Sequence, residues 1–519
     1  MGILVTQKKN YVSIYIAPTI DLTTTLGTAE KGVCFALGKL SYGNPHYAVI
    51  LGKATEKLQT TNINAGGNLD NELAWHIADY FNGYKGKMIV GRVLESDSTT
   101  KILKVVKNAD TEAIELNTDT DINIFGAGNM MEWEDTAVEE MLEIVVTSCI
   151  NKKHSIQITN ENDFITISLF DENGNKVYEV KGGAKYDSVD DNGFPNFIGN
   201  LADKKVMIVK VNPNHTDYTS NFEITQTFEN GLITISGDKN YAQALDIMTN
   251  NIEKCDYYIT AGLTDIPTIQ AMRGIGYEAK ALMVIDLKGA TIDDAKNFKT
   301  AIGINEEDVI YLWNRGKDSF GTLGNMNIGL SGYYVGQAVK RNLSKMIEGV
   351  VEFRVEGIAG VDYPLPRIKA DELATLKDSE KTDLVANRIN TVGYLRRTDG
   401  TEILCLMDVL SGNPKEQATM LYPVVEAKYF IDRYIALIMA SKFFKNLNEA
   451  KSFIQEQVRI LMDRCNRNDY FDNDLAVEER YSFEVVKSAI DEVTVNYGYY
   501  PNGVMRRGAI QGTLKKKVL

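Results

Sequence analysis

Two separate parts of the chain repeat one pattern, in which a short apolar run is followed by a segment with helical spacing. The apolar runs lie at 32–37, 47–51 and 87–93 in the first part and at 257–261, 281–286 and 308–313 in the second, with predicted helices at 69–81, 240–252 and 293–301. Strands separated by helices of this length pair in parallel through right-handed crossovers. The pattern therefore predicts one α/β core assembled from both parts.

The sequence between these parts is of a different kind, with short strands and turn residues. A predicted hairpin joins 164–170 to 177–180, and a second joins 224–229 to 232–235 through Asn230-Gly231. An Asn-Gly pair tolerates the two positive φ angles that a tight hairpin turn needs. One acidic, amphipathic helix is predicted at 136–146. We expect a β-rich domain inserted into the α/β core and projecting from its surface.

Both ends of the chain contain strand-like segments with no obvious local partner. Residues 11–16 alternate with period two and stop at Pro18, and residues 507–519 combine strand-forming side chains with two glycines and three lysines. The residues predicted to form these arms are Val12, Ile14, Ile16, Ala509, Ile510, Thr513 and Leu514. Such segments can add strands to the sheets of neighbouring subunits. The alternative is that each segment completes a sheet of its own chain.

The predicted fold class is an α/β core, a mixed or parallel sheet with helices, with an inserted β-rich domain and extended N- and C-terminal strand arms. A chain of 519 residues is too long for one compact core, so two to four domains are expected. A helix is predicted at 333–346, and the C-terminal part is predicted to hold helices at 424–444 and 448–464, then strands at 481–486 and 492–497. The boundaries are 1–20 for the N-terminal arm, 21–95 and 237–345 for the core, 96–236 for the inserted domain and 346–519 for the C-terminal domain with its arm.

Charge and cysteine usage limit the classes of partner. A net charge of −14 argues against binding nucleic acid through a general electrostatic footprint. The one basic run, Lys515 to Lys517, is either a solvated tail or a contact with an acidic neighbour. The five cysteines are scattered without paired spacing, which favours reduced thiols and assembly in the cytoplasm. No signal peptide or membrane-inserted segment is predicted.

A search for catalytic motifs yields none. The four histidines have no metal-binding spacing. The fragments at 126–128 and 274–276 lack the third glycine of a phosphate-binding loop, and the acidic turn at 187–193 lacks the closing glutamate of a calcium loop. We therefore predict no catalytic residue, no metal and no cofactor, and a protein that is not an enzyme.

The order of segments resembles that of the tail sheath proteins of contractile bacteriophages. The segments that carry the resemblance are 11–18 (an early strand), 73–93 (a helix, a Phe-Asn-Gly turn and an Arg-Val strand), 257–262, 328–336 (a small-residue run before a helix) and 384–392. The resemblance spans both halves of the core and leaves out the insertion. The chain departs from the family at its start, where Asn10-Tyr11-Val12 replaces a Pro-Gly-Val-Tyr type opening.

The resemblance implies a structural subunit that polymerises around a tail tube and contracts to drive the tube through the host envelope. It implies as partners further copies in a helical stack of rings, the tube protein, and the baseplate and tail terminator proteins, with no direct nucleic acid contact and no membrane insertion. The expected location is the virion tail, assembled in the host cytoplasm. A sheath of a related contractile injection or secretion system would share these features, although the unsplit chain and large insertion favour phage. An α/β enzyme with an inserted domain is the third alternative.

Overall fold

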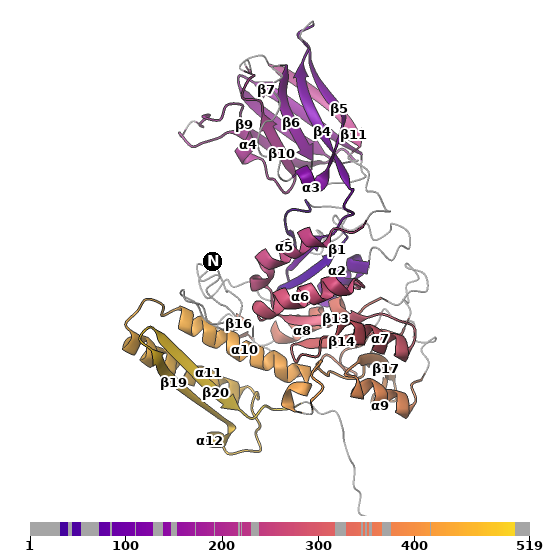
Figure 1. The fold of residues 1–519 in the computed structure, drawn as a ribbon, viewed down its shortest axis with the longest axis vertical. Helices are drawn as coiled ribbons and strands as arrows, with labels where there is room; N and C mark the ends of the chain where they lie inside the picture. Colours follow the sequence, from indigo (N-terminus) through magenta and orange to yellow (C-terminus); the bar gives the residue numbers. More distant parts are fainter. Residues whose placement is uncertain are drawn as a thin grey trace, which may run out of the picture. The chain divides into compact units, whose positions relative to one another are not determined.

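The computed structural model describes most of the chain between Gly32 and Gly503. The described residues are 32–39, 44–52, 72–83, 86–108, 111–127, 139–146, 153–171, 173–190, 192–215, 218, 221–229, 238–316, 328–343, 346–347, 350–351, 355–365, 375–415 and 417–503. The chain divides into two compact units, one of 1–35, 66–87 and 252–519 and the other of 36–65 and 88–251. Figure 1 labels many of the elements of both units.

The core is an eight-stranded sheet with the order β18-β17-β14-β13-β12-β1-β3-β2. Its strands are β1 (Cys34–Gly38), β2 (Val49–Leu51), β3 (Met88–Arg92), β12 (Tyr257–Ile259), β13 (Leu282–Leu287), β14 (Val309–Trp313), β17 (Asn390–Arg396) and β18 (Glu402–Leu406). Strands β12, β13, β14 and β17 pair in parallel, whereas β17 with β18 and β2 with β3 pair antiparallel. The predicted mixed sheet with parallel central strands is thus confirmed.

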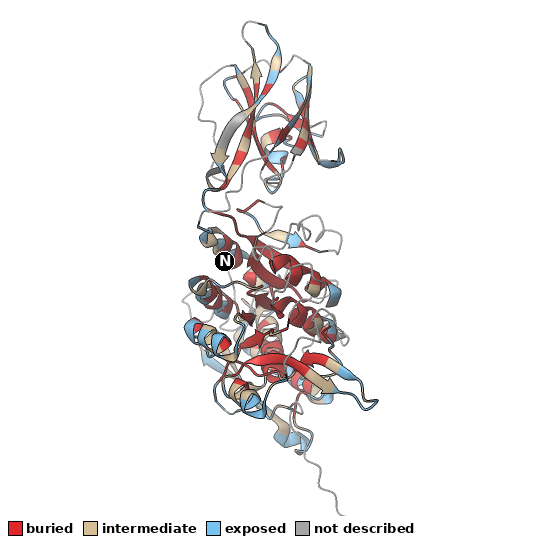
Figure 2. Cartoon of the chain, turned by 90° about the vertical axis from the view of Figure 1, so that its right-hand side faces the viewer, coloured by how far each residue is buried: buried red, intermediate tan, exposed pale blue. Residues whose placement is uncertain are grey.

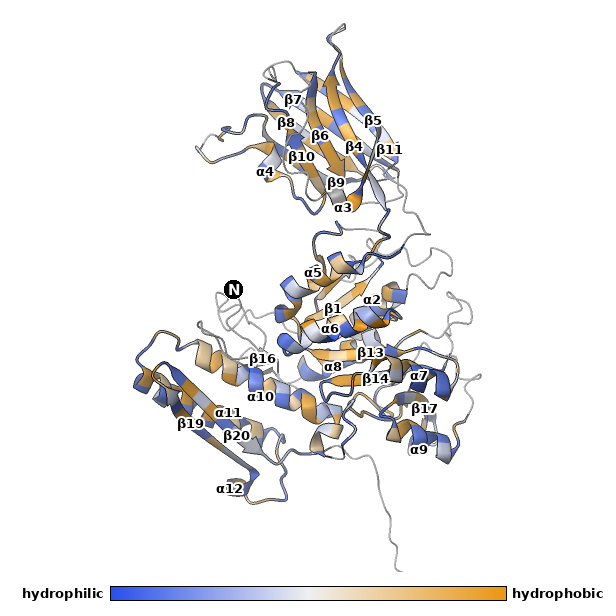
Figure 3. Cartoon of the chain, viewed as in Figure 1, coloured by the Kyte–Doolittle hydropathy of each residue, from blue (hydrophilic) through white to orange (hydrophobic). Residues whose placement is uncertain are grey.

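Burial explains why these strands read as continuous apolar runs. Every residue of β3, β12, β13 and β14 is buried. A parallel sheet covered on both faces needs apolar side chains on both faces, so the alternation typical of a half-exposed strand is absent. In Figure 3 the ribbons of β13 and β14 are accordingly orange, and Figure 2 shows buried residues concentrated in the interior of the chain.

Helices connect and cover the strands of this sheet. They are α2 (Glu72–Gly83), α5 (Tyr241–Asn251), the 3-10 turn η2 (Ile252–Lys254), α6 (Ile266–Glu278), α7 (Ile292–Ile302), α8 (Ser331–Leu343) and α9 (Asp378–Ala386). Local sequence sets their starts: Asp265 caps α6, and Thr291 with Asp294 forms a capping box at α7. Helix α8 packs closely on α2, because a Cβ at Gly332 would lie only 2.3 Å from the carbonyl oxygen of His76.

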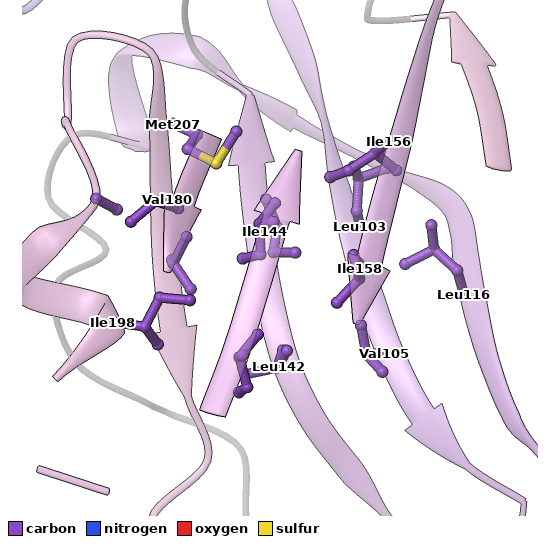
Figure 4. Packing of buried hydrophobic residues seen from close by; sticks show 14 of the residues in the cluster. Leu103, Val105, Leu116, Leu142, Ile144, Ile156, Ile158, Val180, Ile198 and Met207 are labelled. Atoms are coloured by element: carbon purple, nitrogen blue, oxygen red, sulfur yellow. The ribbon is translucent and has the colours of Figure 1, made fainter. Parts of the chain in front are cut away.

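Residues between β3 and α5 form two four-stranded antiparallel sheets. Their orders are β10-β6-β4-β5 and β11-β7-β8-β9. The elements are β4 (Thr99–Lys107), β5 (Ile114–Asn123), α3 (Ile124–Ala127), β6 (Glu140–Val146), β7 (Lys153–Glu161), β8 (Phe164–Phe170), β9 (Lys176–Gly183), α4 (Ile198–Leu201), β10 (Met207–Val211) and β11 (Phe222–Glu229). One apolar cluster draws on both sheets, including Leu103, Ile144, Ile156 and Ile158 (Figure 4). The two sheets therefore enclose a shared sandwich core.

The chain enters and leaves this sandwich side by side. Glu95 forms an isolated antiparallel bridge with Lys239, the Ser96 amide donates to the Asp238 carbonyl oxygen at 2.9 Å, and the Asn240 amide donates to that of Leu94 at 2.8 Å. Main-chain hydrogen bonds therefore hold the two ends of the sandwich segment together.

The helix predicted at 136–146 is wrong over its second half, because residues 140–146 form strand β6. This strand lies between β4 and β10, and its register places Glu143 opposite Lys104 on one side and Lys210 on the other. Both lysines reach that carboxylate, at 3.4 and 3.6 Å. The spacing of the apolar residues in this segment fits a helix as well as a strand. Pairing with β4 and β10 and the ion pairs across those strands favour the strand. Of the hairpin predicted through Asn230-Gly231, the first strand is β11, which pairs with β7, and the second lies outside the described residues.

The C-terminal part contains two long helices and a hairpin. Its elements are β15 (Met346–Ile347), β16 (Val350–Val351), the 3-10 turn η4 (Ala418–Met420), α10 (Tyr422–Ala440), α11 (Leu447–Arg467), α12 (Val477–Arg480), β19 (Tyr481–Ala489) and β20 (Glu492–Tyr499). Pro423 stands in the first turn of α10, where its missing N–H costs nothing. Asn446 caps α11 by accepting from the amides of residues 448 and 449. The two predicted helices and the two predicted strands are confirmed.

Candidate assembly site

The predicted arm residues Val12, Ile14, Ile16, Ala509, Ile510, Thr513 and Leu514 all lie outside the described residues. Their pairing therefore stays a prediction. The structure does describe a surface suited to receive such strands, the hairpin of β19 and β20.

This hairpin is a two-stranded sheet within the part of the chain that the structure describes. Its strands pair from Tyr481 with Tyr499 to Ala489 with Glu492, with one irregularity near the tip. Only Val485 is buried in β19, and no residue of β20 is fully buried. A hairpin has two edges, and each edge presents main-chain N–H and C=O groups that another strand can pair with. An isolated hairpin is marginally stable, so added strands would stabilise it.

Helices α10 and α11 hold the base of this hairpin. The Tyr497 hydroxyl donates to Asp432 on α10, and the Tyr481 hydroxyl donates to Asp463 on α11. Burial and the neighbouring Asp463 carboxylate raise the pKa of Tyr481 to about 12, so the hydroxyl keeps its proton at physiological pH. Phe471 packs against the rings of Tyr481 and Tyr499, with centroids 5.3 and 5.0 Å away. The edges are thereby presented on a fixed base.

The surroundings of the hairpin are acidic. Residues 472–492 contain seven carboxylates, Asp472, Asp474, Glu478, Glu479, Glu484, Asp491 and Glu492, and two basic side chains, Arg480 and Lys487. The chain after Gly503 is basic, with Arg506, Arg507 and Lys515 to Lys517. Opposite charges on two such segments favour their encounter and set which surfaces meet. Both alternatives for the lysine run, a solvated tail and a contact with an acidic neighbour, stay predictions, because residues 515–517 lie outside the described residues.

A buried polar cluster joins α2, β13 and α8, and it is the feature that bears on the enzyme alternative. Ser331 Oγ lies 3.2 Å from His76 Nδ1 and donates to Asp286 Oδ2 at 2.6 Å. The side chains of His76, Asp286 and Ser331 are all fully buried. A serine nucleophile must reach its substrate and give its proton to a base. Here the serine proton is directed to a carboxylate instead, in a position that solvent does not reach.

The same cluster fills the end of the sheet where doubly wound proteins bind ligands. Asp286 stands near the carboxyl end of β13, and its Oδ1 accepts from the amides of Leu330 and Ser331 at 2.6 and 2.9 Å, at the start of α8. A helix N-terminus at the carboxyl ends of parallel strands is an anion-binding position. A carboxylate of the chain itself occupies it, so the cluster serves the packing of α8 on the sheet.

His76 links the two carboxylates of the cluster. Its Nδ1 accepts the Gly332 amide at 3.1 Å, and its Nε2 lies 3.4 Å from Glu72 Oε1 and 3.6 Å from Asp286 Oδ2. Burial disfavours the imidazolium, yet the carboxylates of Asp286 and Glu72 raise the pKa of His76. The Gly332 N–H requires an unprotonated Nδ1, so this bond opposes that rise. The ring therefore links α2 to the start of α8 through the Gly332 amide.

Sequence reasoning missed this cluster because its members lie far apart in the chain. Ser331 is 255 residues from His76 and 45 from Asp286. One local signal was present, since Glu72 and His76 stand at i and i+4 on one helix face.

Substituting Glu72 is expected to flatten the acid dependence of stability. Burial opposes its ionisation, but His76 and Lys288 lower its pKa to about 2 from 4.5. A depressed folded pKa contributes stability that is complete above pH 4.5 and lost as the pH falls towards 2, about 3 kcal/mol in all. We expect Glu72→Gln to lower the thermal midpoint at pH 7 and to leave it less sensitive between pH 4.5 and 2.5. Glu456→Gln, in an exposed pair on α11, is the control, and an equal shift there would contradict the assignment.

Among the described residues no group of three or more His, Cys, Asp and Glu side chains could hold a metal ion. A helix with the length and apolar character needed to cross a bilayer is likewise absent from the part of the chain that was searched.

The fold matches that of a solved structure from end to end. Over 98% of this chain and 99% of the other, with a TM-score of 0.50 and 9% identity, it matches a chain in the structure of the anti-feeding prophage baseplate, 6-fold symmetrised. The resemblance predicted from the order of segments is confirmed at the level of the fold.

Two sheath structures also match, with lower TM-scores. One is the anti-feeding prophage helical sheath in the contracted state, with a TM-score of 0.43, 10% identity, and coverage of 98% of this chain and 99% of that chain. The other is the sheath complex of the PVC extracellular contractile injection system in the contracted state, with a TM-score of 0.40, 16% identity, and coverage of 51% and 74%. No protein-family model and no curated protein matches the sequence.

Proposed function

We propose that this chain is a structural subunit of a contractile tail sheath, which polymerises around a tail tube and contracts to drive the tube through the host envelope. The observation that carries the proposal is the β19–β20 hairpin, a two-stranded sheet among the described residues that is held on α10 and α11 and has an edge on each side. The fold shared with the baseplate chain supports it.

In this proposal the terminal arms of neighbouring copies add strands to the two edges. The N-terminal arm would pair through the main chain around Val12, Ile14 and Ile16, and the C-terminal arm through 509–514. Each added main-chain hydrogen bond contributes about 0.5–1.5 kcal/mol net, so several bonds per arm link copies firmly. A donor end and an acceptor hairpin on every copy make a head-to-tail contact, which does not close on itself and builds a helix of rings.

Contraction then follows from two kinds of contact with different roles. The arms stay paired while the α/β cores rotate and bury new surface against one another, and the buried surface supplies the free energy. The partners are further copies, the tube protein, and the baseplate and tail terminator proteins. We place the assembly in a phage virion tail, built in the host cytoplasm, and the protein acts as a structural element rather than an enzyme.

The second candidate is the sheath of a contractile injection system. The observation that favours it is the end-to-end fold match to the anti-feeding prophage baseplate chain. The tube and the trigger differ between the two candidates, whereas the hairpin and arms would act alike.

Negative-stain microscopy of the purified chain at rising concentration tests the proposal. We expect hollow tubes or helical polymers above a threshold concentration, because strand addition depends on mass action. A chain that stays monomeric at every concentration, and also when its tube protein is added, contradicts the proposal.

A further inference from the structure

We infer that helix α10 mechanically couples the two places where the terminal segments join the core, the N-terminal root at Gly32 and the hairpin β19–β20. The coupling deepens the proposed function, and its use in a sheath rests on that proposal. The contacts themselves belong to one compact unit and can be tested on a single chain.

Gly32 is held on three sides. Its amide donates to Asp256 Oδ2 at 3.0 Å, and its carbonyl oxygen accepts from the Tyr80 hydroxyl at 2.5 Å. Its φ is +66°, and a Cβ there would lie 2.1 Å from Val339 Cγ1. A side chain is therefore excluded both by the backbone conformation and by the neighbour. These contacts fix the position and direction in which the chain joins the sheet.

The neighbouring residues extend the anchor into the sheet. The Val33 carbonyl oxygen accepts from the amides of Asp256 and Tyr257, at 2.9 and 3.3 Å. The Cys34 amide donates to the Lys87 carbonyl oxygen at 3.1 Å. Force applied upstream of Gly32 would thus meet a hydrogen-bonded root rather than a loose linker.

Arg433 connects this root to α10. Its Nη1 pairs with Asp256 Oδ1, and its Nη2 donates to the Cys255 carbonyl oxygen at 2.7 Å. One carboxylate oxygen of Asp256 therefore bonds to the N-terminal root at Gly32, and the other bonds to Arg433 of α10. Charge-assisted hydrogen bonds of this kind are about twice as strong as neutral ones, and partial burial reduces their screening.

Asp432, the residue before Arg433 on α10, contacts the hairpin β19–β20. Asp432 accepts from the Tyr497 hydroxyl of β20. Successive residues of a helix differ by about 1.5 Å along its axis, and a packed helix transmits displacement as a rigid body. Asp432 and Arg433 thus hold the hairpin and the N-terminal root to one turn of α10. In a sheath, tension on one arm would pass to the hairpin through this turn without rearranging the sheet.

Hydrogen exchange on the dilute, full-length chain tests the coupling. Asp256→Ala removes both the Gly32 contact and the partner of Arg433. We expect the amide exchange rates at 32–34 to rise by about tenfold or more, because the loss of one charged hydrogen bond lowers the free energy of local opening. We also expect exchange in 495–499 to quicken several-fold. Tyr497→Phe should produce the reciprocal effect at 32–34, since coupling between two sites is mutual.

The matched control is Asp308→Ala, which breaks a comparable ion pair with Arg273, at 2.8 Å, in the same unit. In this variant the amide exchange rates at 32–34 and at 495–499, each divided by the mean rate of the rest of the chain, should equal those of the wild type. Quicker exchange at 32–34 alone after Asp256→Ala, or the same pattern after Asp308→Ala, overturns the coupling. A wild-type chain that forms no tubes counts against the proposed function only, because exchange is measured on single chains.

Discussion

Deleting residues 508–519 is expected to abolish polymer formation while the single chain keeps its fold. The deleted segment contains Ala509, Ile510, Thr513 and Leu514, the residues proposed to add a strand to a neighbouring copy. The contacts that hold the end of the described core precede it: the Asn502 amide donates to the Tyr470 carbonyl oxygen at 2.8 Å, and Phe471 bridges Pro501. Losing several strand hydrogen bonds, about 3–6 kcal/mol in all, raises the threshold concentration about 10²- to 10⁴-fold.

Single substitutions distinguish the effect of strand pairing by the C-terminal arm from the effect of shortening the chain. Ile510→Pro removes a backbone donor and resists a paired strand, whereas Ile510→Val keeps both the donor and the strand preference. Negative-stain counts of tubes against concentration should show loss for the first and little change for the second. Tubes from the deletion variant at the wild-type concentration would refute the role of the arm. Replacing Lys515 to Lys517 by glutamine should weaken assembly mainly at low salt, where charge attraction is least screened.

The α/β core could be predicted because its strands are buried on both faces. The runs around 281–286 and 308–313 are apolar apart from Asp286 and Asp308, so composition and length both pointed to β13 and β14. Strand β6 could not be predicted in this way, because its apolar residues fit a helix as well as a strand. The decision there depends on Lys104 and Lys210, which reach Glu143 only after β4 and β10 have paired with it.

The strands of the candidate site could be predicted from the sequence, but the contacts that hold them could not. The strand character of 481–486 and 492–497 was readable from local sequence and is confirmed in β19 and β20. Their attachment was not readable, because Tyr497 meets Asp432 across 65 residues of chain. Likewise, nothing near Gly32 indicates that Asp256, 224 residues away, accepts its amide proton. Contacts of this separation are products of the fold and leave no local period in the sequence.

Replacing Arg341 is expected to cause the largest loss of stability of any single change proposed here. Its Nη2 donates to Glu426 Oε2 at 2.9 Å, and both side chains are almost completely buried, with 1% and 0% exposed. Arg341→Met leaves Glu426 with the Tyr257 hydroxyl, which donates to Oε1 at 2.8 Å. Breaking one partner of a buried pair typically costs about 3–5 kcal/mol, because the remaining charge is desolvated and unpaired.

The pH dependence of that loss identifies its cause. Burial raises the pKa of Glu426, and the Arg341 charge is the main influence that lowers it. Without Arg341 the folded pKa rises further above the unfolded value, and a raised carboxyl pKa means that stability falls as the pH rises from the unfolded towards the folded pKa. Thermal unfolding of Arg341→Met should therefore show a larger deficit against wild type at pH 8 than at pH 5. The double variant Arg341→Met with Glu426→Gln should recover part of the deficit at pH 8, because no charge is left buried. A deficit equal at both pH values would assign the loss to packing of the arginine side chain instead.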